Sequence, residues 1–161
     1  MKYQRLSKEQ LEELHVEFIN FLSAQTITAE EWNDIKLNKP EVAEEEIDIF
    51  SDLVWEKVLT NAKYVEHFSK DQIHLFALAE DQMQLIAIKV NNESIDITTK
   101  QGYQWLQDNL LNDEVVFYNA SKEYSEDKNG DKFALIQKGA NITNGELYRY
   151  FAKWIQDKEN G

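Results

Sequence analysis

Hydrophobic positions recur at helical spacing through the first third of the chain. Apolar side chains three or four positions apart predict one amphipathic helix over residues 7–24. A short helix with Trp32 and Ile35 inward follows it, and a longer helix covers residues 40–59. Pro40 suits the first position of the longer helix. The three starts share a capping pattern, a Ser, Thr or Asn with Gln or Glu three residues later: Ser7–Gln10, Thr28–Glu31 and Asn38–Glu41.

The helix over residues 40–59 carries two opposed rows of side chains. Because residues two positions apart lie about 200° apart on a helix, one face is acidic and the other apolar. The acidic row consists of Glu41, Glu45, Asp48, Asp52 and Glu56. The apolar row consists of Ala43, Ile47, Phe50, Val54 and Val58. We expect Ile47, Phe50, Val54 and Val58 to be buried, and the acidic row to face solvent.

The pattern changes to strands in the middle of the chain. Residues 73–79 and 83–90 predict a hairpin with a turn at 80–82, and residues 115–120 predict a third strand. Two further capping patterns predict helices that start at Thr98 and Thr143. Asn129-Gly130 indicates a tight turn. The pattern of residues 131–138 is compatible with a strand or a helical turn.

This order of elements predicts an α+β fold. A helical N-terminal region, residues 1–60, packs with a small antiparallel sheet of about three strands and a C-terminal helix. We expect one domain over residues 1–161, in which residues 61–161 form the α+β remainder. The alternative is a helical arm of residues 1–60 beside a compact remainder.

The charge of the chain restricts its partners. The 161 residues carry a net charge of −13, with no Cys. Residues 1–60 hold 14 acidic and 6 basic residues, a net of −8. Because binding to nucleic acid depends on clustered Lys and Arg, the composition argues against direct nucleic-acid binding. The sequence lacks a signal peptide and a membrane span, so we expect a cytoplasmic protein.

Sequence motifs for catalysis and for metal or cofactor binding are absent. Glu12-x-x-His15 and Asp71-x-x-His74 resemble parts of a di-iron signature, but such a site needs four inward-facing helices. The segment 127–131 resembles the start of a calcium loop without its later Gly and Glu. We therefore expect no metal, no cofactor and no catalytic residues.

Two functions from different classes remain. The first is a non-enzymatic protein-interaction or regulatory module that uses the acidic row Glu41, Glu45, Asp48, Asp52 and Glu56 against a basic protein surface. The alternative is a small enzyme or ligand-binding domain. Its site would lie between the sheet and the helices and would use His67, His74 or Tyr118.

Four segments resemble a family of short acidic bacterial proteins that is known as a domain of unknown function. They are RLSKEQLEELHVEFINFL, PEVAEEEIDIFSDLVWEKVL, IDITTKQGYQWL and NGELYRYF. The resemblance spans nearly the whole chain, which favours one co-inherited domain. It implies an intracellular bacterial protein and transfers no functional residues.

Overall fold

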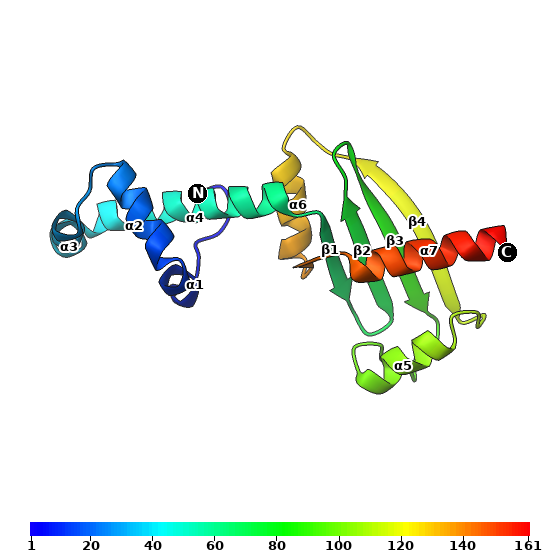
Figure 1. The fold of residues 1–161 in the computed structure, drawn as a ribbon. Helices are drawn as coiled ribbons and strands as arrows, with labels where there is room; N and C mark the ends of the chain where they lie inside the picture. The colour runs from blue at the N-terminus through cyan, green and yellow to red at the C-terminus, as the bar shows by residue number, and fades with distance from the viewer. The chain divides into compact units, whose positions relative to one another are not determined.

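The computed structural model describes residues 1–161, which form two compact units, Met1–Thr60 and Asn61–Gly161 (Figure 1). The division falls at the predicted boundary between the helical region and the α+β remainder. That the whole chain behaves as one domain stays a prediction. None of the seven helices combines the length and apolar content needed to cross a membrane.

The N-terminal unit consists of helices: α1 (Lys8–Glu13), α2 (His15–Ala24), α3 (Ala29–Asn38) and α4 (Pro40–Asn61). The predicted capping box at Ser7 is confirmed. The Ser7 side chain accepts a hydrogen bond from the Gln10 backbone N–H, and the Gln10 side chain accepts one from the Ser7 backbone N–H. Thr28 caps α3 through the Glu31 N–H, and α4 begins at Pro40. The first two starts agree with the sequence because each depends on residues only three positions apart. The predicted Asn38–Glu41 cap was wrong, since Asn38 is the last residue of α3 and its side-chain amide donates to Asp34. The start of α4 at Pro40 agrees with the preference of Pro for the first helical position.

The prediction of one helix over residues 7–24 was wrong. Leu14 has φ −97° and ψ 24°, outside the helical region, so the helix breaks into α1 and α2. The two helices then run in different directions (Figure 1). No Gly or Pro marks this break in the sequence.

Aromatic side chains form the centre of the N-terminal unit. The Phe18 ring lies 5.0 Å from the Phe50 ring and 5.2 Å from the Trp32 ring, measured between centroids. Of the apolar row on α4, Ala43 and Phe50 are buried and Ile47 and Val54 are half-buried. The prediction that Val58 is buried was wrong, since Val58 is 40% exposed. Val58 lies two turns beyond Phe50, past the part of α4 that the aromatic rings cover.

The C-terminal unit contains a five-stranded antiparallel sheet in the order β4-β3-β2-β1-β5. The strands are β1 (Tyr64–Phe68), β2 (Gln72–Leu78), β3 (Gln82–Val90), β4 (Val115–Glu123) and β5 (Asn141–Thr143). The α+β class is confirmed, but the sheet has five strands instead of about three. The missed strands are the two at one edge: β1 carries charged and polar residues, and β5 is too short to show a period.

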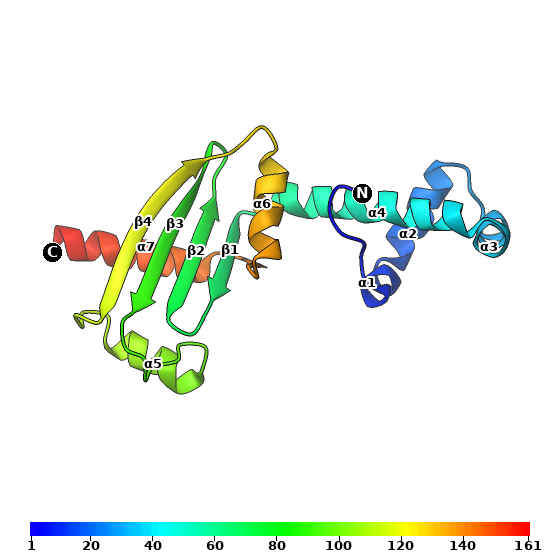
Figure 2. The ribbon, with the colours of Figure 1, turned by 180° about the vertical axis from the view of Figure 1, so that it is seen from behind.

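Helices cover the two sheet faces unequally. Helices α5 (Lys100–Asp108) and α7 (Glu146–Asn160) contribute to the main core, in which Leu106 and Phe151 pack with strand residues such as Ile88. Helix α7 crosses this face of the sheet (Figures 1 and 2). Helix α6 (Lys128–Gln137) lies beside β1, and its Leu135 packs on a smaller cluster that includes Val65 and Leu78.

Three local predictions in this unit need correction. The undecided segment 131–138 belongs mainly to α6, and Asn129-Gly130 lies in the first turn of α6, because Asp127 caps it through the Gly130 N–H. The cap of α5 is Thr99 instead of Thr98. Thr143 belongs to β5 and accepts from the Gly145 N–H, so α7 starts two residues later than predicted.

Candidate functional site

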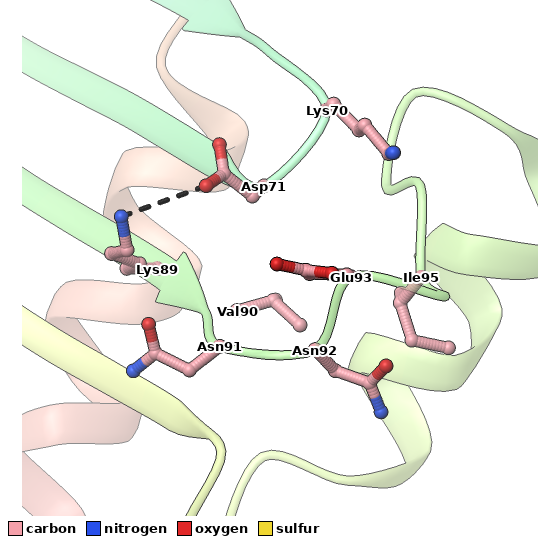
Figure 3. A pocket seen from close by; sticks show the side chains of 8 residues that line it. All are labelled: Lys70, Asp71, Lys89, Val90, Asn91, Asn92, Glu93 and Ile95. Carbon is pink, nitrogen blue, oxygen red and sulfur yellow. Dashed lines mark ion pairs between the residues drawn. The ribbon is translucent and has the colours of Figure 1, made fainter.

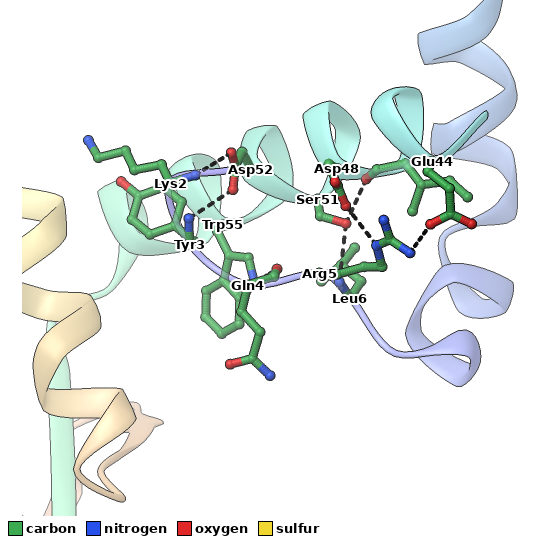
Figure 4. A network of polar contacts seen from close by, with 11 residues as sticks. Lys2, Tyr3, Gln4, Arg5, Leu6, Glu44, Asp48, Ser51, Asp52 and Trp55 are labelled. Carbon is green, nitrogen blue, oxygen red and sulfur yellow. Dashed lines mark hydrogen bonds and ion pairs between the residues drawn. The ribbon is translucent and has the colours of Figure 1, made fainter. Parts of the chain in front are cut away.

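The acidic row on α4 already holds a segment of the same chain. Residues 2–6, here called the strap, lie along α4 (Figure 4). Asp52 accepts hydrogen bonds from the backbone N–H groups of Lys2, at 2.7 Å, and Tyr3, at 2.9 Å. One carboxylate therefore satisfies two consecutive backbone donors that would otherwise bond to water.

Arg5 pairs with the next carboxylates along α4. Arg5 Nε lies 2.7 Å from Asp48 Oδ1, and Arg5 Nη1 contacts Glu44 Oε2. The hydrogen bond to Asp48 and, to a smaller extent, the one to Glu44 raise the pKa of the Arg5 guanidinium above its ordinary value. Because the guanidinium stands in solvent, the pair positions the strap more than it stabilises the fold.

The two ends of the strap are held differently. Near its start, the Tyr3 hydroxyl donates to Glu56, and burial together with this contact raises the pKa of Tyr3. At its end, the Leu6 N–H donates to Ser51 Oγ at 3.1 Å, and Leu6 and Ser51 are both buried. Between them, Trp55 Nε1 donates to the Gln4 carbonyl oxygen at 2.9 Å.

The strap divides the predicted acidic site into two parts. Asp48, Asp52 and Glu56 bind strap residues, whereas Glu41 and Glu45 are exposed at the N-terminal end of α4. Partner binding by the row stays a prediction. Sequence reasoning missed the strap, although the basic residues Lys2 and Arg5 are the signal that could have suggested it.

The residues of the alternative site lie in one row across the sheet. His67 of β1 lies opposite His74 of β2, which lies opposite Ala87 of β3, which lies opposite Tyr118 of β4. Directly opposed residues point to the same face of a sheet. His67 and His74 line a common cavity, but Tyr118 is 53% exposed and does not line it.

The histidine cavity is small and mostly apolar. It has a volume of about 220 Å³, and its lining consists of His67, His74, Phe76, Leu85, Leu135, Lys138 and Ala140. Burial, with a contribution from the nearby His67, lowers the pKa of His74. A titratable group with a shifted pKa in a cavity is a feature of functional sites.

A second cavity, of about 750 Å³, is open and polar (Figure 3). Its charged groups are partly paired with one another, since Lys89 Nζ lies 3.5 Å from Asp71 Oδ2. The Asn92 amide donates to Glu114 at 2.9 Å. Six of the eight lining residues are polar or charged, so the cavity lacks the predominantly apolar walls of a typical ligand site.

The side chains provide no cluster for a metal ion. No group of three or more His, Asp and Glu residues comes together. His15 is exposed on α2, Asp71 directly precedes β2, and His74 is the third residue of β2.

The profile of one protein family matches residues 1–156, nearly the whole chain. The chain belongs to a family of unknown function, DUF6495. The matched residues include nearly all of both compact units. No curated protein and no solved structure matches the chain.

Proposed function

We propose that this protein is a non-enzymatic cytoplasmic interaction or regulatory module that binds a basic surface of a partner protein through α4. One observation carries the proposal. Glu41 and Glu45 are exposed and continue a row whose next members, including Asp48, already hold a basic segment of the same chain.

Electrostatics favour a basic partner at this end of α4. Like charges four residues apart on a helix cost about 0.2–0.5 kcal/mol at low salt. Glu41 and Glu45 have this spacing, with no Lys or Arg between them. A cation placed against both relieves the repulsion, and the net charge of −8 on residues 1–60 speeds the approach of a basic surface.

The strap supplies an example of what the row recognises. Its donors to the row are backbone N–H groups, a guanidinium and a phenol hydroxyl. A protein partner carries the same three kinds of donor. An extended basic segment of such a partner therefore matches the chemistry of the uncovered end.

Charge reversal at the uncovered end tests the proposal. The double substitution Glu41→Lys and Glu45→Lys removes the attraction between this end of α4 and a basic surface. It keeps Asp48 and Asp52, which bind the strap. We expect partner recovery from the native cell, measured by affinity capture and mass spectrometry, to be lost in this variant. The matched control is Glu80→Lys with Asp81→Lys, the same charge change at an exposed turn of the sheet.

Equal recovery with both double variants, each with wild-type circular dichroism, contradicts the proposal.

A narrower form of the proposal is that the row mimics nucleic-acid phosphates and occupies the binding site of a nucleic-acid-binding protein. Duplex DNA or RNA then competes for the captured partner, and the absence of competition rejects that form alone.

A further inference from the structure

The histidine cavity has one polar side and otherwise apolar walls. The apolar walls consist of Phe76, Leu85, Leu135 and Ala140, and no carboxylate lines the cavity. An apolar protein cavity of about 150 Å³ is large enough to bind benzene. The volume of about 220 Å³ therefore admits one ring, or a branched chain of similar size, together with a small polar group.

The polar side consists of groups that can carry positive charge. His67 comes from β1, His74 from β2, and Lys138 from the C-terminal end of α6, while β3 contributes only the uncharged Leu85. His67 and His74 lie directly opposite one another in the β1–β2 ladder. The Lys138 ammonium attracts an anion and repels a metal cation. The imidazole N–H groups can donate hydrogen bonds to the same anion.

Gly139 brings the main chain close to the His67 ring. Its φ is +110°, and a Cβ atom at this position would lie 2.9 Å from His67 Nε2. A side chain here would be strained and would push against the imidazole. Glycine at this position thus leaves room for the His67 ring beside the cavity.

We infer that this cavity binds a small monocarboxylate with an aromatic or branched apolar body, its carboxylate facing His67, His74 and Lys138. The inference does not rest on the proposed function, because every residue involved belongs to the C-terminal unit. The carboxylate accepts hydrogen bonds from the imidazoles, and the apolar body replaces water against Phe76 and Leu85.

Binding of this kind is coupled to proton uptake. Without a ligand, burial and the neighbouring His67 disfavour the charged form of His74. A bound carboxylate favours the imidazolium form of His74 and so raises the proton affinity of His74. The affinity for the carboxylate therefore falls as the pH rises and His74 loses its proton.

Benzoate is a suitable probe for the full-length protein, with benzylamine as a ring of similar size and opposite charge. We expect benzoate to shift the imidazole NMR signals of His67 and His74 but not that of the exposed His15. Isothermal titration calorimetry is expected to give a Kd about tenfold higher at pH 8 than at pH 6, the effect of roughly one linked proton. Benzylamine is expected to cause no shift.

Substitutions locate the site. His67→Gln and His74→Gln are each expected to raise the Kd for benzoate about tenfold, with His15→Gln as the matched control that leaves it unchanged. Lys138 is exposed, so Lys138→Gln should fold even where a histidine variant does not. This variant is also expected to raise the Kd for benzoate. Failure of benzoate to bind, equal binding of benzylamine, or shifts confined to other residues would overturn the inference.

Discussion

The backbone N–H of Leu6 donates a hydrogen bond of 3.1 Å to Ser51 Oγ, and Ser51 is fully buried in α4. Ser51 Oγ in turn donates to the Ile47 carbonyl oxygen at 2.8 Å. A hydroxyl in the middle of a helix thus satisfies a buried donor from a segment 45 residues away in the sequence. This pair anchors the buried end of the strap.

Ser51→Ala is expected to destabilise the protein by about 1–3 kcal/mol, because the Leu6 N–H would remain buried without an acceptor. The free energy of unfolding in urea measures the effect. Ser23→Ala, at an exposed helical serine, is the control and should change stability by less than about 0.5 kcal/mol. Equal effects at the two positions would show that the Leu6 bond contributes nothing specific.

Asp52→Ala is expected to release the first residues of the strap, since Asp52 accepts from the N–H groups of both Lys2 and Tyr3. Amide hydrogen exchange of Tyr3 should become much faster. Glu45→Ala removes the same charge from the same helix and should leave this rate unchanged, because Glu45 is exposed away from the strap contacts. A similar acceleration in both variants would point to net charge instead of the hydrogen bonds.

Gly102→Ala tests the packing of α5. Helix propensity favours Ala over Gly by about 1 kcal/mol. However, a Cβ atom at Gly102 would lie 1.8 Å from the Asp96 carbonyl oxygen, so the backbone must move. Because such overpacking costs about 1–3 kcal/mol, we expect a net loss of stability in thermal or urea unfolding. Gln101→Ala, at an exposed position of the same helix, should show no such loss.

The pH dependence of stability should reveal the buried environment of His74. Its pKa is lowered in the folded protein, so the unfolded chain binds more protons between the two pKa values. Stability therefore falls as the pH drops below about 6.5, the ordinary histidine value. Between pH 7 and pH 5.5, the wild type should lose more stability than His74→Gln.

Burial raises the pKa of Glu66, which acts in the opposite direction, but Glu66 is present in both proteins. The difference between the two unfolding curves thus isolates His74. Parallel curves across this pH range would contradict the assignment.

Local signals located the starts of α1, α3 and α4, but they did not reveal the break between α1 and α2. The Ser7 and Thr28 caps and the start of α4 at Pro40 involve neighbours within one turn, so sequence alone reveals them. The break at Leu14 has no such marker. Beyond the break, α2 places Phe18 against Phe50, a contact that no short window of sequence contains.

The sheet was predicted where its strands are regular. The hairpin of β2 and β3 and the strand β4 have clear apolar patterns, and all three are present. Strand β5 has only three residues and is a strand because Ile142 pairs with Val65 of β1. Pairing partners of that kind are separated too far along the chain for a periodic pattern to reveal them.

Sequence alone determined that this protein combines α and β structure and that α4 carries a continuous acidic row, because both follow from periodicity within single elements. Only the tertiary structure decided that the strap binds three of the five acids of that row and that His67 and His74 line one cavity. Arg5 and Asp48 are 43 residues apart, and the cavity is lined by residues of three strands and of the end of α6. Such contacts depend on the path of the chain between the elements, which the pattern within each element does not contain.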